Sequence, residues 1–402
     1  MTSPMDDHIW ITGIGVACSI GLNVEESLNA LISGRRGIGP IRLLDTIHKD
    51  HFRVGEIALT DHQMMEVLGI PVILYKRFTR TSLIGMMAAK EALLASGIDL
   101  ADGVSTALVS ATTVGGMDKT EREFSRGNVA SGFVSTHPCG DSTDKIADFL
   151  GLTGYRTTLS TACSSSANAI IHAARLIKHR RVDRAIVGGV DALSRFTLNG
   201  FNSLMILDRE ECRPFDRNRK GLNLGEGSGY LVMEPERLLS PGDKRKICRL
   251  SGYANANDAH HQTASSPDGQ GAYDAMRGAL ASGGLNPGEI DYINAHGTGT
   301  ENNDASEGAA LVRVFGDLMP PFSSTKAFTG HTLGAAAGIE AVFSILAIQQ
   351  GVLFPGLGFE EPMEAPSISP VPFLEVGLDI QHVLSNSFGF GGNNSTLIFS
   401  KS

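Results

Sequence analysis

The chain has 402 residues, of which 42% are hydrophobic and 19% are charged, so it can bury a large core and is not extensively disordered. Its length exceeds that of one ordinary domain, which favours a duplicated or two-part architecture. The formal net charge of −9 argues against general nucleic-acid binding, although it leaves room for a local basic patch.

The first residues and the cysteines predict the surroundings of the protein. The N-terminal residues lack the cationic region and apolar run of a signal peptide, and no uninterrupted apolar stretch is long enough to cross a bilayer. The cysteines are odd in number and have no metal-ligand spacing: Cys18, Cys139, Cys163, Cys212 and Cys248. We therefore expect a cytoplasmic protein with free thiols, no metal site and no membrane segment.

Segments rich in Val, Ile and Gly alternate along the chain with segments of helical period. In chain order, the patterns predict a strand, a helix, two strands, a helix and a final pair of strands: His8–Val16, Thr81–Ser96, Ser105–Val109, Arg184–Val190, Gly334–Gln349, Gln381–Ser387 and Ser395–Ser400. This alternation indicates an α/β fold with buried sheets.

Two short motifs suggest ligands but are incomplete. The run Gly13-Ile14-Gly15 superficially resembles a dinucleotide-binding turn, yet the third glycine and the acidic ribose ligand are missing, so we do not favour a nucleotide site. His260 and His261 have no carboxylate or cysteine partner at a metal-ligand spacing, and we expect a structural or site-lining role for them.

Cys163 lies in the small-residue run Thr161–Ser166, directly before a stretch of helical period. A thiol at the first turn of a helix faces unpaired backbone N–H groups and the positive end of the helix dipole, both of which favour the thiolate. A buried structural cysteine is an equally good interpretation of this segment alone.

The chain contains a hint of duplication. Cys163 precedes a helix that leads to the strand Arg184–Val190, and Lys326–His331 precedes the helix Gly334–Gln349, which leads to a strand near Leu384. The Pro/Gly and basic cluster at Pro241–Lys246 is a candidate boundary between two halves.

Three further motifs carry candidate chemistry, although each alone is compatible with an ordinary loop. Ile293–Thr300 places His296 after a short strand, Ser323–His331 places Lys326 and His331 before a helix, and Ser385–Asn394 is a Gly/aromatic turn. With Cys163 they supply a nucleophile, two imidazoles, a lysine and a turn rich in N–H groups. That set fits thioester chemistry.

These motifs resemble the β-ketoacyl-acyl carrier protein synthases, the elongating condensing enzymes of fatty acid and polyketide synthesis. The resemblance runs from about Ile9 to Ser400, with the motifs in the family's order. They are Thr161–Ser166, Arg213–Asp216, Leu224–Gly227, Asn294–Thr300, Ser324–His331 and Asn386–Asn393. It implies a thiolase fold, in which two similar βαβαβαββ halves, here 1–245 and 246–402, form a five-layered αβαβα architecture. It also implies a homodimer, or a heterodimer with a related synthase.

The resemblance implies a role for each motif. Cys163 would take the acyl chain from acyl carrier protein, and the N–H groups of Cys163 and Phe390 would hold the oxyanion. His296 and His331 would stabilise the enolate formed when malonyl carrier protein loses carbon dioxide, and Phe390 would gate the entry of malonate. Lys326, with Glu340, would orient the histidines.

The resemblance also implies substrate contacts. No cofactor would be bound covalently, since the phosphopantetheine arm arrives on the carrier protein. The contacts of the arm would be Thr263, Thr298 and Thr300. Val114, Phe133 and Phe201 would line the acyl pocket, and Phe388 would also contact substrate. Asp304 would support the site. The best candidates for a basic patch that binds the acidic carrier protein are Lys76, Arg77 and Arg80, with Arg209 behind them. A solvated basic helix start is the weaker alternative for the first three.

Several positions depart from the family's usual pattern. The connection Leu207–Arg213 is short, Lys220 replaces a common Asp, Leu222 a common Phe, and Ala337 a common Gly. These departures favour considering an accessory pathway, such as aryl polyene synthesis, beside fatty acid synthesis. A non-catalytic chain-length partner is the alternative function, which the presence of Cys163 disfavours. A thiolase would need a second, C-terminal cysteine, and none follows Cys248.

Overall fold

The computed structural model describes residues 8–125 and 135–402. In these ranges ten strands are joined in one sheet, in the order β10-β9-β13-β14-β8-β1-β7-β6-β4-β5. Phe133, an expected acyl-pocket residue, lies outside the described residues.

The sheet consists of two halves with the same topology. In each half, two parallel pairs are followed by two antiparallel pairs, so that β5-β4-β6-β7-β1 repeats as β10-β9-β13-β14-β8. The halves meet where β1 pairs with β8 through Ile11 and Cys248. The duplication predicted from the two helix-start motifs is confirmed.

Each half runs βαβαβαββ along the chain. The first comprises β1 (Ile9–Cys18), α3 (Arg80–Ser96), β4 (Thr106–Ala111), α5 (Cys139–Leu150), β5 (Arg156–Leu159), α6 (Ser165–Lys178), β6 (Arg184–Asp191) and β7 (Gly227–Pro235). The second comprises β8 (Cys248–Asn257), α8 (Gln270–Gly283), β9 (Tyr292–Asn294), α9 (Glu301–Phe315), β10 (Phe322–Ser323), α11 (Ala336–Gln350), β13 (His382–Gly389) and β14 (Asn393–Lys401). The predicted division after residue 245 falls in the connection between β7 and β8.

Smaller elements surround these halves. They are α1 (Val24–Ser33), β2 (Ile38–Pro40), β3 (Arg53–Gly55), α2 (Asp61–Leu68), α4 (Met117–Ser125), α7 (Arg195–Ser203), α10 (Lys326–Thr329), β11 (Val352–Leu353) and β12 (Glu375–Val376). The pairs β2–β3 and β11–β12 form two short ribbons outside the main sheet.

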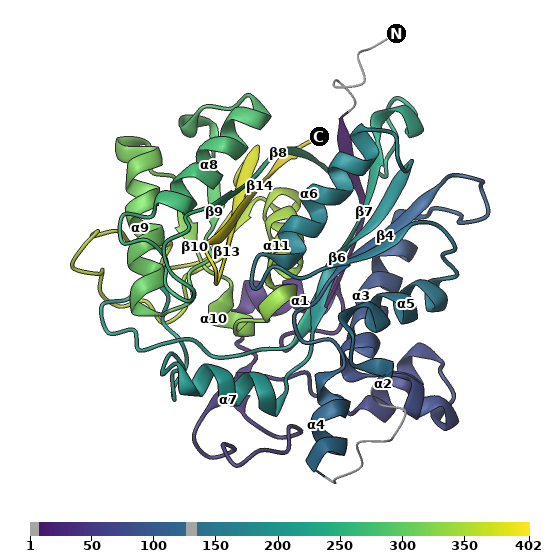
Figure 1. Ribbon diagram of the computed structural model, residues 1–402. Helices are drawn as coiled ribbons and strands as arrows, with labels where there is room; N and C mark the ends of the chain where they lie inside the picture. Colours follow the sequence, from purple (N-terminus) through teal and green to yellow (C-terminus); the bar gives the residue numbers. More distant parts are fainter. Residues whose placement is uncertain (1–7, 126–134) are drawn as a thin grey trace.

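Helices and sheet halves alternate in five layers (Figure 1). The α3 and α5 helices cover the outer face of the first half, α8 and α9 cover that of the second, and α6 and α11 pack between the halves. This is the predicted αβαβα arrangement of the thiolase fold.

The central helix α11 is apolar because it is covered on all sides. By length and composition, Leu333–Gln350 is one stretch among the described residues that could cross a membrane, and 89% of it is buried inside the protein. The sequence analysis predicted a helix here, but it found no uninterrupted apolar stretch long enough to cross a bilayer. Its burial explains its composition as that of a core helix.

The glycines of the incomplete nucleotide motif allow β1 to approach α3 closely. A Cβ atom at Gly13 would lie 2.2 Å from the carbonyl oxygen of Ala92, and one at Gly15 would lie 2.1 Å from that of Ala88. Any side chain at either position would push the helix off the strand. The motif therefore serves packing, as its missing ligand residues suggested.

Candidate active site

Cys163 lies at the turn that leads into α6, between the two halves of the sheet. The turn is strained, since Ala162 adopts a left-handed backbone with φ of +52°. The side chain of Ser165 secures it by accepting a hydrogen bond from the N–H of Thr161 and donating one to the carbonyl of Ala162. Only 6% of Cys163 is exposed.

Burial changes the expected state of the thiol. Desolvation raises the pKa of Cys163 to about 11, although the charge of Lys326 and the backbone N–H groups of Phe390 and Cys163 lower it. Burial therefore opposes the preference for thiolate that the helix start provides, and the balance is a raised pKa. At neutral pH the group is a thiol that ionises only in the reaction.

We predict that alkylation of Cys163 by iodoacetamide accelerates about tenfold per pH unit from about pH 7 to about pH 9. The thiolate is the reactive form, and its fraction grows tenfold per unit below the pKa. Mass spectrometry of the Cys163 peptide measures the rate separately from half-buried Cys139. A rate that levels off below about pH 8 would contradict the raised pKa.

The hairpin between β13 and β14 delivers one of the two backbone donors at the Cys163 sulfur. Its Phe390 N–H is hydrogen-bonded to the Cys163 sulfur, and the N–H of Cys163 also contributes. The turn is close to Cys163 because Gly389 lacks a side chain: a Cβ there would lie 2.9 Å from the carbonyl oxygen of Thr161. Two converging N–H groups beside a nucleophile can hold an oxyanion.

Asn393 ties this turn to α6, a link that sequence reasoning missed. Its side-chain oxygen accepts hydrogen bonds of 2.8 Å from both Ser164 Oγ and Asn168 Nδ2. The oxyanion turn and the helix that begins after Cys163 are thus joined across the two halves of the chain.

Two buried carboxylates shape the loop that carries His296. Glu307 accepts the N–H groups of His296 and Gly297 at 2.9 and 2.8 Å, and Asp304 accepts those of Thr298 and Gly299. Asp304 was expected to support the site, whereas Glu307, one helical turn further along α9, was missed. Burial raises the pKa of Glu307 to about 7.

Lys326 sets the tautomer of His296. Its ammonium, 2% exposed, donates to His296 Nδ1 at 3.1 Å, to the His296 carbonyl at 2.6 Å and to the carboxylate of Glu340. Since an ammonium can only donate, Nδ1 must accept, and the imidazole proton lies on Nε2. The predicted association of Lys326 with Glu340 is present as a buried ion pair.

A backbone N–H sets the tautomer of His331 in the same sense. Leu333 donates to His331 Nδ1 at 3.1 Å, which again leaves the proton on Nε2. The His296 and His331 rings lie 5.5 Å apart, nearly perpendicular. Burial first, and the charge of Lys326 second, hold the pKa of each imidazole well below its usual value. Both rings are therefore neutral N–H donors at physiological pH.

These groups line one cavity of about 410 Å³, a volume within the usual range for small-molecule sites. Predicted residues on its wall are Cys163, Phe201, Thr263, His296, Thr298, Thr300, His331, Phe388 and Phe390. Phe201 and Phe390 stack at 5.9 Å between ring centroids. Val114 lies off this wall, in an apolar cluster with Leu222, Leu333 and partly buried Phe201.

Asp191 is a further residue that the sequence analysis missed. From the end of β6, its buried carboxylate accepts hydrogen bonds from Thr112, Thr113 and Val114 and from the N–H of Gly334. It thereby connects the loop after β4 with the segment that follows His331. Its place at the carboxyl end of a predicted strand was the available signal.

Arg80 must be withdrawn from the predicted basic patch. Its guanidinium is largely buried and forms ion pairs with Glu226 and Asp61, so its role is to link segments within the fold. Lys76, Arg77 and Arg209 are exposed.

Other expectations concern cysteines and metals. All five cysteines are free thiols. Within residues 8–125 and 135–402, no group of three or more His, Cys, Asp or Glu side chains is placed to hold a metal ion. His260 and His261 are both exposed, and His261 Nδ1 accepts the N–H of Thr263.

Known proteins match the chain over its whole length. Nodulation protein E of Rhizobium meliloti strain 1021 is 34% identical, over 98% of this chain and 99% of that protein. The 3-oxoacyl-(acyl-carrier-protein) synthase 2 of Staphylococcus aureus strain N315 is 31% identical, over 98% of each chain.

Solved structures match equally broadly. The ishigamide ketosynthase/chain length factor superposes with a TM-score of 0.90 at 31% identity, covering 98% of this chain and 99% of that chain. The ketosynthase ApeO in complex with its chain length factor ApeC, from Xenorhabdus doucetiae, gives 0.84 at 32% identity and covers both chains fully.

Family models agree with the relatives. Residues 6–238 match the N-terminal domain of β-ketoacyl synthases, and residues 247–360 match the C-terminal domain. The cysteine and the two histidines line one cavity, and the lysine is hydrogen-bonded to His296. With these matches, the chain belongs to the β-ketoacyl synthase family.

Proposed function

We propose that this chain is a catalytic β-ketoacyl-acyl carrier protein synthase, which joins an acyl group held on Cys163 to a two-carbon unit from malonyl carrier protein. The observation that carries the proposal is the convergence of Cys163, the Phe390 N–H and two neutral imidazoles on one cavity. Each is a group that decarboxylative condensation needs.

In the first step, the Cys163 sulfur attacks the acyl thioester carbonyl. The new carbon–sulfur bond forms while the N–H groups of Cys163 and Phe390 hold the oxyanion, and the phosphopantetheine thiol leaves with the proton that Cys163 loses. The raised pKa of Cys163 places this ionisation within the reaction instead of before it.

In the second step, malonyl carrier protein loses carbon dioxide and leaves an enolate. The Nε2–H groups of His296 and His331 donate to its oxygen, and they can do so without transferring a proton because both rings are neutral. The enolate carbon then attacks the acyl-Cys163 carbonyl. Collapse of that intermediate releases the β-ketoacyl carrier protein and expels the Cys163 thiolate, which takes a proton from water to restore the thiol.

Lys326 acts in this scheme as a positioning residue. Its ammonium fixes His296 with Nε2–H directed away from the buried pair, while Glu340 balances its charge. A positive charge held beside the two histidines also disfavours their protonation. The histidines therefore stay donors instead of acids.

The main alternative is a non-catalytic chain-length partner, and the solved relatives include ketosynthases described together with such factors. Cys163 with its complete set of donors favours the catalytic assignment. We also propose, on the family resemblance, that the chain works as a homodimer or as a heterodimer with a related synthase. Acyl carrier protein as partner and a cytoplasmic location are predictions of the same kind.

A turnover assay decides between the two functions. The isolated chain, given acyl and malonyl carrier protein, is expected to form the β-ketoacyl product, detected by mass spectrometry. Acyl groups of graded length and unsaturation, with aryl-polyene-like chains among them, assign the pathway. A chain that shows turnover only after a second synthase subunit is added, and then equally with Cys163→Ala, would be the non-catalytic partner.

We predict that His331→Ala slows malonyl decarboxylation by about 10²–10³-fold, the usual effect of removing one oxyanion donor. Acylation of Cys163 should change far less, because His331 does not contact the oxyanion turn in the scheme. His331→Asn, which keeps an amide donor, should retain more decarboxylation. Equal loss of both steps would contradict this division of roles.

A further inference from the structure

Lys220 is the only lysine or arginine among the described residues that line the Cys163 cavity. It is exposed, and within the described parts of the chain its ammonium makes no ion pair and no hydrogen bond. The preceding residue differs: Arg219 is committed to the carbonyls of Asp216, Thr300 and Glu301. The cavity wall therefore carries one positive charge that no described residue of the chain neutralises.

Two glycines hold Lys220 beside the threonine loop. Gly221 donates its N–H to the carbonyl of Gly299 at 3.0 Å. A Cβ at Gly299 would lie 2.7 Å from the carbonyl oxygen of Gly221, so the two segments touch only because Gly299 has no side chain. Lys220 is thus fixed at the exposed end of the wall that Thr298 and Thr300 continue inward.

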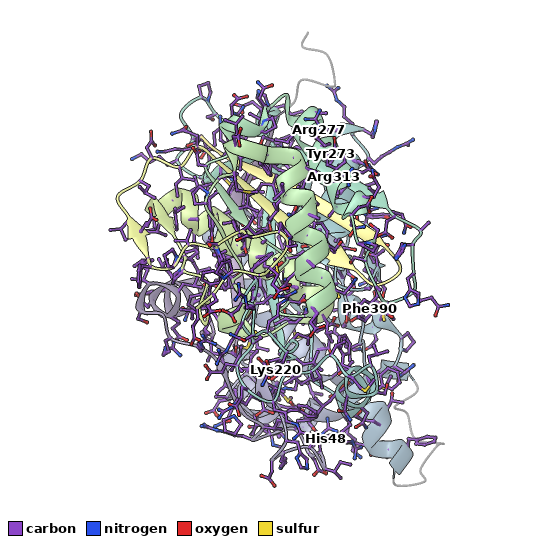
Figure 2. All side chains as sticks on the ribbon, turned by 90° about the vertical axis from the view of Figure 1, so that its left-hand side faces the viewer. His48, Lys220, Tyr273, Arg277, Arg313 and Phe390 are labelled. Atoms are coloured by element: carbon purple, nitrogen blue, oxygen red, sulfur yellow. The ribbon has the colours of Figure 1, made fainter. Side chains whose placement is uncertain are left out.

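The reacting groups line the buried part of the cavity. Cys163, His296 and His331 are buried, whereas Lys220 and its neighbour Glu301 are exposed. Figure 2 labels Lys220 and Phe390, two wall residues from different segments of the chain. A substrate whose thioester reaches Cys163 can therefore lie along the threonine loop with its far end near Lys220.

We infer that Lys220 binds the phosphodiester of the phosphopantetheine arm. This inference rests on the proposed function. The arm has its thioester at one end, uncharged amides in the middle and one anionic phosphate at the end joined to the carrier protein. The cavity offers a thiol and imidazoles in its depth, hydroxyls along its wall and one unpaired cation at its mouth, which is the same order of chemistry. Lys220 is thus a residue that favours carrier-bound and phosphorylated thioesters over uncharged ones.

Glu301 is expected to weaken the attraction of Lys220 for the phosphate. Its carboxylate lines the same mouth, and no ion pair or hydrogen bond to it is present in the described residues. A negative charge beside an incoming phosphate weakens the attraction that Lys220 provides. The two residues therefore predict opposite effects on the same step.

The test compares two synthetic acyl thioesters that are identical except for the phosphate: acyl-phosphopantetheine and acyl-pantetheine. The second-order rate constant for acylation of Cys163 is measured by intact mass for each. We expect the wild-type chain to prefer the phosphorylated thioester by about fivefold, the effect of one partly exposed ion pair. Lys220→Ala should remove the preference by slowing only the phosphorylated thioester, while Lys220→Arg keeps it and Glu301→Gln enlarges it.

A control and a salt series sharpen the result. Lys244→Ala, which removes an exposed lysine in the β7–β8 connection, should leave the preference unchanged. Sodium chloride at about 0.5 M should reduce the wild-type preference by screening.

Acylation without any phosphate preference, or an equal loss with both thioesters in Lys220→Ala, overturns this inference alone. A Lys220→Ala defect confined to carrier-protein thioesters also overturns it and assigns Lys220 to a carboxylate of that protein. No acylation of Cys163 by any thioester overturns the proposed function as well.

Discussion

Replacement of Cys163 by alanine is expected to abolish acylation of the chain and to lower condensation by at least about 10⁴-fold. The reason is chemical, because no other described thiol has the surroundings of Cys163. Cys18, Cys212 and Cys248 are buried with raised pKa values and lie off the cavity wall. Intact mass after incubation with an acyl carrier protein thioester measures the adduct.

The same variant should keep malonyl decarboxylation, because the two histidines and Lys326 do not depend on the sulfur. Cys163→Ala and His331→Ala therefore predict opposite patterns, in which one loses acylation and the other loses decarboxylation. Cys139→Ala is the matched control, since it removes a half-buried thiol outside the cavity. An adduct that survives Cys163→Ala would place the nucleophile elsewhere.

The fold could be predicted from the sequence because its signals are local. The strand and helix periods gave β1, α3, β4, β6, α11, β13 and β14 to within a few residues. Cys163 and the lysine–histidine segment stand at equivalent points of the two halves, before α6 and α11, which is why a slight likeness between them indicated the duplication.

What the sequence could not provide depends on partners distant along the chain. Arg80 follows Lys76 and Arg77 and therefore resembles part of an exposed basic run. In the fold it is largely buried, because it pairs with Glu226, 146 residues away. The period of a helix shows which of its faces is buried, yet it does not show what covers the turn before it. For that reason the burial of Cys163, and with it the raised pKa, was not predicted.

The histidine tautomers illustrate the same limit. His296 and His331 could be named as candidates from their loops, but their protonation depends on Lys326 Nζ and on the N–H of Leu333. Both imidazoles carry their proton on Nε2, although a different donor occupies Nδ1 in each. The sequence identified the residues, and only the three-dimensional contacts showed that both can donate.

Replacement of Lys326 by alanine should cost about 3–5 kcal/mol of unfolding free energy, because it leaves Glu340 buried without its partner. Urea denaturation measures this loss. The double variant Lys326→Ala/Glu340→Ala should recover part of it, since the uncompensated carboxylate is then gone. If the double variant were as unstable as the sum of the two single variants, the pair would not be coupled.

The loss should also depend on pH. Burial already raises the pKa of Glu340, and removing the positive charge of Lys326 raises it further. A carboxyl whose pKa is higher in the folded than in the unfolded chain stabilises the fold at low pH and loses that contribution as pH rises through the folded value. Lys326→Ala should therefore lose stability, relative to the wild type, as the pH rises above the ordinary carboxyl range and through the raised pKa of Glu340.

The catalytic effect of Lys326→Ala separates positioning from folding. Without the ammonium, Nδ1 of His296 loses its donor, and the pKa values of His296 and His331 move back towards the ordinary range because Lys326 no longer lowers them. Decarboxylation should then fall most steeply on the acid side, where protonated rings replace neutral donors. A decline that is uniform across pH and matches the fraction unfolded would instead show that Lys326 has only a structural role. Its burial against two histidines would then have no catalytic reason.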